Sequence, residues 1–428
     1  MIDIKIIREN PDLVRKAARD KGLRVDLDRL RELDRRRREL ETEFNQLRHE
    51  QRVKGEQIAA APKEQKAALS KALAGHKQRL KAIEQELEPL GAQIHELMLL
   101  VPQIPDPAAP VGPDDSANVE VRRVGTPKRK ADFGFEFRDH VTLGTGLDII
   151  DIERGVKLAG SRNYVLKGTG ALLHEAVLRL AWDRMMARGF TPLTVPVLVS
   201  EKLMYGTGFF PLHREEVYLC ERDGQCLVGT AEVPVTGLHA DEILSLEELP
   251  KLYVARSTCF RREAGAAGRD TYGLYRIHWF DKLEQVVVCK ADPAESARWH
   301  EEIIRNAEEV LQALELPYRV VEVCTGSMGQ GKVRMFDIET WMPSREAYSE
   351  THSASRFHDF QARRLNLRYR DQHGRVQVCH TLNNTVIASP RILIPLLELN
   401  QNADGSVTLP AALREYLGGL ERIDRRRV

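Results

Sequence analysis

The sequence predicts an α+β protein in which a long antiparallel helical arm precedes a domain built on an antiparallel β-sheet. Three observations lead to this prediction: two helical stretches with a repeating apolar seam, a segment rich in proline and glycine after them, and a mixture of helical and strand-like segments from about residue 139. The chain has 428 residues. This is too long for one ordinary core, so we expect two or three domains.

The arm is predicted from apolar or semi-apolar side chains that recur at steps of three and four. In its second half they fall at Leu69, Leu73, His76, Leu80, Ile83, Leu87, Leu90, Ile94, Leu97 and Val101. The first half has a similar but interrupted seam at Leu30, Leu33, Leu40, Phe44, Leu47 and Ile58. This spacing is typical of a coiled coil. Pro62 separates the halves, which should fold back on one another, and Pro89 should kink the second helix without ending it.

The composition changes sharply at 101–118, VPQIPDPAAPVGPDDSAN, where proline and glycine cannot continue a helix. We therefore predict an N-terminal domain at 1–103, a linker at 104–138 and a second domain at 139–428. The second domain should contain a helix over ALLHEAVLRLAWDRMMARG and a strand over TPLTVPVLV. The sequence has neither a GxGxxG nor a GxxxxGK[ST] motif, so neither a dinucleotide fold nor a P-loop is indicated.

Charge and cysteine usage limit the class of protein. The formal net charge is +1, which gives no global signal for a polyanion partner. The first 100 residues have a mild basic excess, densest at Arg35–Arg38, and such an excess is more often a solvated helix face than an RNA site. The six cysteines form no CxxC pair, so we expect no zinc site, no disulfide framework and a cytoplasmic location. We expect no targeting peptide and no membrane helix, which would need about 18 apolar residues.

The most informative stretch is 258–285, TCFRREAGAAGRDTYGLYRIHWFDKLEQ. Its centre is rich in glycine and its flanks are β-prone, which predicts an antiparallel hairpin with a long mobile loop. Arg261 offers a planar fork to a phosphate or carboxylate, while Glu263, Glu284 and Phe280 add two carboxylates and an aromatic face. On pattern alone, such a hairpin is more often solvated surface than a ligand site.

This stretch resembles, nearly residue for residue, motif 2 of the class II aminoacyl-tRNA synthetases in its seryl-tRNA synthetase version, FRxEAGxAGRDTxGLxRxHxFxKxE. The resemblance extends from MIDIKIIRENPDLV to NQNADGSVTLPAALREYL. It implies a class II synthetase catalytic domain that uses ATP to convert L-serine to seryl-adenylate and then transfers the seryl group to tRNA(Ser). It also implies a tRNA-binding arm and a homodimer, since Gly189–Val199 resembles the motif 1 element of the dimer interface.

The resemblance places six residues at serine: Thr230, Ala231, Glu232, Arg261, Glu284 and Thr385. The first three belong to VGTAEVP, which resembles the family's serine-binding TAE motif, and a hydroxyl and a carboxylate are suitable acceptors for an ammonium group. Glu284 and Thr385 would contact the serine hydroxyl. A site built to satisfy a hydroxyl rejects an analogue that lacks it far better than an apolar pocket rejects an extra methylene.

A second set would bind ATP: Arg261, Arg262, Glu263, Ile277, Phe280, Glu350, Thr351, His352, Ser353 and Arg391. Arg261, Glu263 and Arg391 are the expected catalytic residues. Arg261 would bridge the serine carboxylate and the α-phosphate, which orients both reactants and neutralises charge. Glu263 would accept a hydrogen bond from the adenine amino group, with the backbone near Ile277 completing the adenine edge. Phe280 would stack on the ring, and Arg391 would cover its other face and reach the γ-phosphate.

The segment AYSETHSASRFHDFQARR resembles the family's YREISSCSNCEDFQARR. The resemblance therefore implies that Glu350 and Ser353 hold the Mg²⁺ that accompanies ATP, because both offer oxygen ligands.

Four positions depart from the family pattern. Trp279 replaces a common glutamine, His352 replaces a serine, and Asn384 and Val386 stand where glycines are frequent. We expect all four beside the active site. They leave open a resistant or specialised paralogue of a seryl-tRNA synthetase. A catalytically silent RNA-binding homologue is a further alternative, against which the retained ligand set argues.

Overall fold

The computed structural model describes residues 1–424 except 61 and 267–269, and it leaves aside the side chains at 59, 63–72 and 266. The chain forms two compact units, Met1–Pro102 and Gln103–Val428. Among the described residues, no helix combines the length and apolar character that crossing a membrane requires.

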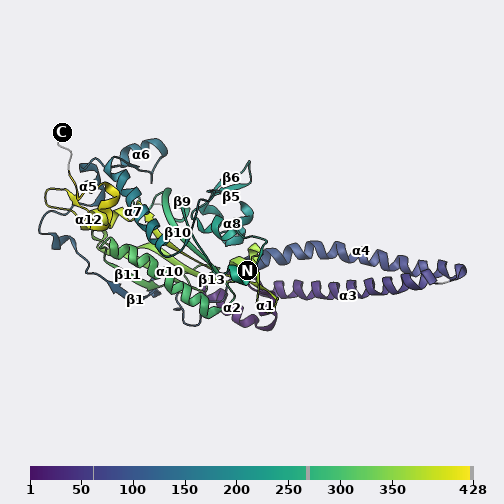
Figure 1. Cartoon of the computed structure of the whole chain (residues 1–428). Coiled ribbons are helices and arrows are strands. Elements are labelled where there is room, and N and C mark those ends of the chain that lie inside the picture. Colours follow the sequence, from purple (N-terminus) through teal and green to yellow (C-terminus); the bar gives the residue numbers. More distant parts are fainter. Residues whose placement is uncertain (61, 267–269, 425–428) are drawn as a thin grey trace. The chain divides into compact units, whose positions relative to one another are not determined.

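The regular elements of the first unit, within its described residues, are helices. They are α1 (Ile4–Glu9), α2 (Pro11–Asp20), α3 (Leu27–Ala60) and α4 (Lys63–Leu100). The last two lie side by side and run in opposite directions (Figure 1), which confirms the predicted arm. Pro89 lies inside α4, which continues through it. Short α1 and α2 pack through Ile7 and Val14 on the same apolar cluster as the base of the arm.

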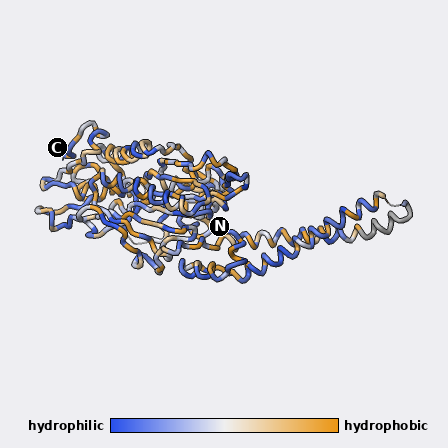
Figure 2. The backbone as a smooth tube through the Cα atoms, turned by 60° about the horizontal axis from the view of Figure 1, so that its bottom comes forward, coloured by the Kyte–Doolittle hydropathy of each residue, from blue (hydrophilic) through white to orange (hydrophobic). Residues whose placement is uncertain are grey.

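The predicted seam forms the core of this unit. Its buried members include Leu30, Leu33, Leu40, Ile83, Leu90 and Ile94, while the Leu69 side chain lies outside the described residues. Hydrophobic and hydrophilic positions alternate along both helices (Figure 2). Ion pairs at the seam margin fix the antiparallel register, with an Arg36–Glu86 contact of 2.7 Å and an Arg79–Glu43 contact of 2.6 Å.

The second unit is organised around an eight-stranded sheet of order β1-β11-β12-β13-β16-β10-β9-β4. These strands are β1 (Val119–Val124), β4 (Thr191–Leu193), β9 (Lys251–Phe260), β10 (Trp279–Cys289), β11 (Tyr318–Glu322), β12 (Arg334–Met342), β13 (Ala347–His358) and β16 (His380–Ser389). All neighbours are antiparallel except β4, which runs parallel to β9. The predicted antiparallel sheet is therefore confirmed.

Two long helices cover one face of this sheet. They are α7 (Thr169–Ala187) and α10 (Pro293–Ala313), which contact the central strands β10, β13 and β16 (Figure 1). Apolar side chains such as Leu283, Val287 and Leu382 point toward the helices and form the largest core of the protein. Because side chains alternate along a strand, the neighbouring positions face the other side, where polar residues gather.

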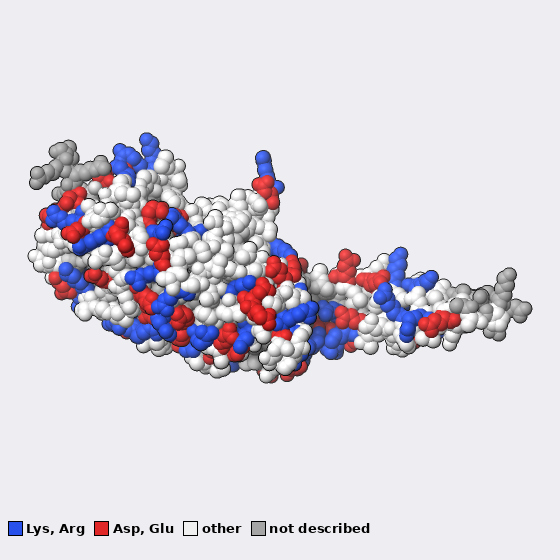
Figure 3. Space-filling model, viewed as in Figure 1, with Lys and Arg blue, Asp and Glu red and all other residues white. Residues whose placement is uncertain are grey.

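Smaller elements surround the sheet. The helices are α5 (His140–Gly146), α6 (Ile152–Ala159), α8 (Glu201–Thr207), α9 (Glu232–Gly237), α11 (Phe360–Leu365), α12 (Leu393–Leu399) and α13 (Ala411–Arg414). The short strands are β2 (Ile150–Asp151), β3 (Val165–Leu166), β5 (Leu198–Ser200), β6 (Tyr218–Cys220), β7 (Gln225–Leu227), β8 (Ile243–Leu244), β14 (Arg368–Arg370), β15 (Val376–Val378), β17 (Val407–Thr408) and β18 (Arg422–Ile423). Charges of both signs are interspersed over the face shown in Figure 3, as the net charge of +1 suggests.

Two predicted elements differ from the structure. The stretch 104–138, expected to be only a linker, contributes β1, which pairs with β11 at the edge of the sheet. The strand expected over 191–199 is divided into β4 and β5, which belong to different sheets. Pro196 lies between them, and proline has no backbone N–H to donate to a ladder.

The hairpin predicted over 258–285 is present. β9 and β10 pair in an unbroken antiparallel register that includes Phe280 opposite Cys259 and Glu284 opposite Ala255. The centre of the connecting loop, 267–269, lies outside the described residues. On its other side β10 pairs with β16, where the register shifts and Val386 is the extra residue of a β-bulge.

Candidate active site

A cavity of about 600 Å³ opens on the sheet face that α7 and α10 do not cover. Its floor consists of alternate side chains of the central strands, including Glu284 on β10, Ser353 and Ser355 on β13, and Thr385 on β16. A smaller space of about 40 Å³ adjoins it and is lined by Tyr275, Ile277, Phe280, Ala388 and Arg391. Arg261, Glu263, Lys282, Glu350 and Thr385 line both spaces, which therefore form one continuous site.

Two buried carboxylates, those of Glu232 and Glu284, lie at one end of the cavity. The Glu232 backbone N–H donates to Thr230 Oγ1 over 3.2 Å where α9 begins, and Gln361 Nε2 donates to Glu232 Oε1 over 2.7 Å. Burial, followed by the charge of Glu284, raises the pKa of Glu232 to about 7. A cationic ligand placed here would favour the ionised carboxylate.

Glu284 is held by neighbours on the sheet floor. Its carboxylate forms an ion pair with Lys282 and accepts a hydrogen bond of 3.4 Å from Thr385 Oγ1. Both Lys282 and Glu284 are buried. A carboxylate held in this way can accept a hydrogen bond from a small hydroxyl.

Arg261 lies at the end of β9, between the two spaces. Its guanidinium carbon is 5.1 Å from the centre of the Phe280 ring, and Nη2 donates to the Gly229 carbonyl over 3.4 Å. The Arg261 backbone N–H donates to the His278 carbonyl over 2.9 Å. The loop is therefore tied to the return strand, and the fork is directed into the cavity.

The aromatic end has a second arginine. Arg391 Nε donates to the Tyr275 carbonyl over 3.0 Å, and its Nη1 donates to the Glu350 carbonyl over 3.1 Å. Glu263 has φ of +53° and pairs with Arg276 over 3.0 Å. Arg391 is therefore held by two backbone carbonyls, and the Glu263 carboxylate is paired with Arg276 in this structure.

Three oxygen-bearing side chains converge on neighbouring strands β12 and β13. Asp337 lies opposite Ser353 in the register and interacts with its hydroxyl. Desolvation and the charge of Glu350 raise the pKa of Asp337, whose Oδ1 has no partner among the described groups. An orphaned carboxylate oxygen beside a second carboxylate suits a hard divalent cation.

The structure brings most of the predicted ligand residues to this cavity and leaves three side chains outside its lining. Ala231 packs in an apolar cluster with Val235 and Tyr253. Arg262 is exposed and reaches the Glu215 carbonyl. The His352 ring lies on the helix-facing side, where Nε2 donates to the Val386 carbonyl over 3.1 Å.

Several lining residues were not predicted. They include Lys282, Arg276, Tyr275, Gln330 and Lys332. Asp337, opposite Ser353 in the sheet, was not predicted either. Lys282 and Arg276 both lie within the motif 2 hairpin. Lys282 is two residues from Glu284 on β10, so strand alternation alone would have placed these two side chains on the same face. Lys332 lies in the segment TGSMGQGK, and only the tertiary structure brings this segment next to the cavity.

None of the four departures from the family pattern lines either space of the cavity. Asn384 donates to the Ile303 carbonyl of α10, and Val386 packs in the core beneath the helices. His352 is buried on the same face, and desolvation lowers its pKa to about 3. Trp279 stacks on Tyr164 with ring centres 4.9 Å apart. Alternation and the bulge at Val386 direct the side chains of His352, Asn384 and Val386 away from the site.

Comparisons with known proteins agree with this geometry. A model of the seryl-tRNA synthetase N-terminal domain matches residues 1–105, and one of the class II tRNA synthetase core domain (G, H, P, S and T) matches residues 218–400. A serine–tRNA ligase from Deinococcus radiodurans is 49% identical over 423 residues, which cover 98% of each chain.

Solved structures give the same result. A seryl-tRNA synthetase from Pyrococcus horikoshii, solved with ATP, has a TM-score of 0.91 at 38% identity and covers 99% of this chain and 100% of its own. A cytoplasmic serine–tRNA ligase from Naegleria fowleri, solved with AMP, has a TM-score of 0.88 at 30% identity and covers 100% of this chain and 99% of its own. The chain therefore belongs to the seryl-tRNA synthetase family of class II aminoacyl-tRNA synthetases.

Proposed function

We propose that this chain activates L-serine with ATP and transfers the seryl group to tRNA(Ser), and that both steps take place in the sheet cavity. The observation that supports this best is the convergence of Arg261, Glu232 and Glu284 on one cavity. They supply a fork for a carboxylate and a phosphate, an acceptor for an ammonium group and an acceptor for a hydroxyl. Serine-dependent exchange of pyrophosphate into ATP tests the first step.

Serine is bound by groups that match its three polar functions. Its ammonium group donates to Thr230 Oγ1 and the Glu232 carboxylate, which lie together at the start of α9. Its hydroxyl donates to Glu284, whose orientation Lys282 and Thr385 maintain. Its carboxylate lies at Arg261, which also contacts the α-phosphate and so brings the reacting oxygen and phosphorus together.

ATP is bound from the opposite side of Arg261. The adenine stacks on Phe280 and is covered by Arg391, while Glu263 accepts from the adenine amino group after releasing Arg276. Glu350, Ser353 and Asp337 are the groups that would hold Mg²⁺. When bound, Mg²⁺ supplies positive charge to the phosphates. The other contacts are positional, so no side-chain nucleophile is needed.

The raised pKa of Glu232 predicts how serine binding depends on pH. Below pH 7 the carboxyl group is increasingly protonated, because its pKa is about 7. A neutral acid binds the serine ammonium group more weakly than a carboxylate. The KM for serine in pyrophosphate exchange should therefore rise about tenfold for each pH unit below 7 and level off above it.

The matched control for this dependence is Glu232→Gln. It should bind serine weakly at every pH and show no such rise in KM between pH 5.5 and 7.5. A wild-type KM for serine that stays constant over this range would contradict the role of Glu232.

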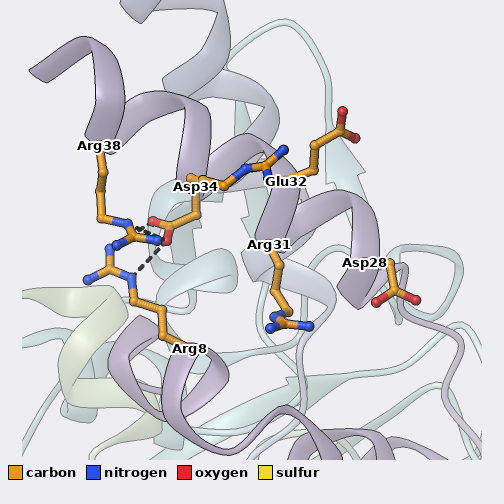
Figure 4. Close-up of a pocket in the computed structure, with 7 residues that line it drawn as sticks. Arg8, Asp28, Arg31, Glu32, Asp34 and Arg38 are labelled. Atoms are coloured by element: carbon orange, nitrogen blue, oxygen red, sulfur yellow. Dashed lines mark hydrogen bonds and ion pairs between the residues drawn. The ribbon is translucent and has the colours of Figure 1, made fainter. Parts of the chain in front are cut away.

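For the N-terminal unit we propose tRNA binding through the arm. A groove of about 350 Å³ at the base of α3 is lined by Arg8, Asp28, Arg31, Glu32, Asp34, Arg35 and Arg38. Arg8 and Arg38 both pair with the buried Asp34, at 2.7 and 3.3 Å, while Arg31 lies apart from this cluster (Figure 4). Arginines held in this way suit the RNA backbone, because guanidinium groups pair with phosphates.

We further propose a cytoplasmic homodimer. The Gly189–Val199 segment, which resembles motif 1, includes β4, the edge strand of the large sheet. An edge strand offers unpaired backbone groups to a second copy. All six cysteines are free, as is usual in a reducing compartment. Light scattering tests the dimer, and cell fractionation tests the location.

A further inference from the structure

Three amide side chains are buried between α10 and the sheet, on the face opposite the cavity. Gln285 of β10 and Asn384 of β16 are fully buried, and Asn306 of α10 is 3% exposed. Gln285 Nε2 and Asn384 Nδ2 both donate to the Ile303 carbonyl of α10, over 2.8 and 2.6 Å. Asn306 Nδ2 donates to Gln285 Oε1 over 2.9 Å. These three side chains, called the amide cluster below, therefore connect one turn of α10 to two central strands.

The amide cluster lies directly behind the two residues that are proposed to contact the serine hydroxyl. In the ladder between β10 and β16, Gln285 is opposite Asn384, and the next pair along the ladder is Glu284 opposite Thr385. Because adjacent residues of a strand point to opposite faces, the first pair faces α10 and the second pair lines the cavity. A shift of either strand at the amide cluster would therefore change the separation of Glu284 and Thr385.

The backbone ladder is irregular at this point. The pairing of β10 with β16 changes register between Leu283 and Glu284, which leaves Val386 as the extra residue of the bulge. A bulge disrupts the ladder locally and bends the strand, so backbone pairing alone specifies the position of Thr385 poorly. The side chain of Asn384, where glycine is frequent in the family, adds a hydrogen bond to α10 two residues before the bulge.

Apolar side chains would hold α10 against the sheet at a lower cost in free energy. Oδ1 of Asn306 and Oδ1 of Asn384 are buried and have no hydrogen-bond partner among the described groups. A buried polar atom without a partner destabilises the folded state, whereas apolar groups of the same shape in its place are often neutral or stabilising. Stability therefore does not account for the amide cluster, but its directional hydrogen bonds can fix the positions of two strands.

We propose that the amide cluster is a positioning network for serine recognition, which fixes the separation of Glu284 and Thr385 and so sets the preference for serine over alanine. The inference rests on the proposed function, because it requires that Glu284 accepts the serine hydroxyl. None of the three amides lines the cavity, so they act on the substrate only through the strands. Alanine has no hydroxyl to donate to Glu284, so its binding does not depend on the amide cluster.

The first test compares two non-hydrolysable sulfamoyl analogues of an aminoacyl-adenylate, one that carries serine and one that carries alanine. Their affinities are measured for the wild-type protein and for Gln285→Met/Asn384→Leu, in which apolar side chains of similar size replace two amides. The seryl analogue should bind at least about 10-fold more weakly to the variant, since a well-aligned hydrogen bond to a charged group contributes about 10- to 150-fold. The affinity for the alanyl analogue should stay unchanged.

The kinetics of pyrophosphate exchange provide a second readout. In the double variant the KM for serine should rise while the KM for ATP stays at the wild-type value, because the residues proposed to bind ATP include neither Glu284 nor Thr385. Gln285→Met and Asn384→Leu are also measured singly. Each should raise the KM for serine, so the test does not depend on the folding of the double variant.

Val287→Ala is the matched control. Val287 is fully buried, lies two residues after Gln285 on the helix-facing side of β10 and has no amide group. This variant should lower the Tm, because it leaves a cavity in the core, and it should preserve the ratio of the two affinities. The double variant should instead keep a Tm at or above the wild-type value and lose much of this ratio.

Two results would overturn the proposal: an unchanged affinity ratio in the double variant, or an equal loss of affinity for both analogues. The second result would show that the amides only hold the fold. A wild-type protein that binds the seryl and alanyl analogues equally well would instead contradict recognition of the hydroxyl by Glu284, and with it the proposed function. The two failures are therefore distinguishable.

Discussion

Replacing Arg261 with alanine should reduce serine-dependent pyrophosphate exchange by about 10²- to 10³-fold, the usual effect of removing one charge-stabilising donor from a reaction centre. Arg261 lines both the space at the aromatic end and the larger space at the carboxylate end of the described cavity. Without it, the serine carboxylate and the α-phosphate would repel each other and lose their alignment. The loss should appear in kcat as well as in KM, because the charge on the phosphorus oxygens increases in the transition state.

Two further variants sharpen this prediction. Arg261→Lys keeps the charge but loses the planar fork, so its exchange rate should lie between those of wild type and Arg261→Ala. Arg222→Ala removes an exposed arginine from the turn between β6 and β7 and should behave as wild type. An Arg261→Ala protein that exchanges pyrophosphate at nearly the normal rate would show that motif 2 has been misassigned.

Shortening the arm should separate the two steps of the reaction. The Arg79–Glu43 pair marks where α3 and α4 face each other, so deletion of residues 48–78 with a short glycine-rich connection preserves the base of the arm. Exchange should remain normal because the cavity belongs to the second unit. Transfer to tRNA(Ser) should fall by on the order of 100-fold, since the deletion removes basic residues such as Arg48, Arg52 and Lys54 that can contact RNA phosphates.

The informative readouts for this variant are tRNA affinity and its salt dependence. The slope of log affinity against log salt should become shallower than in the full-length protein. Charging of tRNA(Ser) at the full-length rate by the shortened protein would exclude a tRNA-binding role for the removed part of the arm.

Local patterns predicted the arm and the motif 2 hairpin well. The heptad seam specifies which side chains meet, so positions such as Leu40 and Ile83 are buried as expected. The hairpin was predictable because β9 and β10 are adjacent in the chain. The family resemblance pointed to residues on β13 and β16, such as Glu350 and Thr385, that line one cavity and that no local pattern could bring together.

The face of the sheet to which each side chain points was harder to predict. Adjacent residues on a strand point to opposite faces, and a bulge shifts this alternation by one position. Asn384 and Val386 flank Thr385 in sequence, yet they face the helices while Thr385 faces the cavity. The edge strand β1 was missed because its pairing with β11 is entirely non-local.

The central claim, that this cavity selects serine by its hydroxyl, is tested most directly by pyrophosphate exchange measured separately with each of the twenty amino acids. Serine alone should support strong exchange. Alanine should be poorer by about 10⁴-fold, because it lacks the hydroxyl that donates to buried Glu284. Threonine should also be weak, since its extra methyl group must fit beside Thr385. Exchange with alanine equal to that with serine would contradict recognition of the hydroxyl by Glu284.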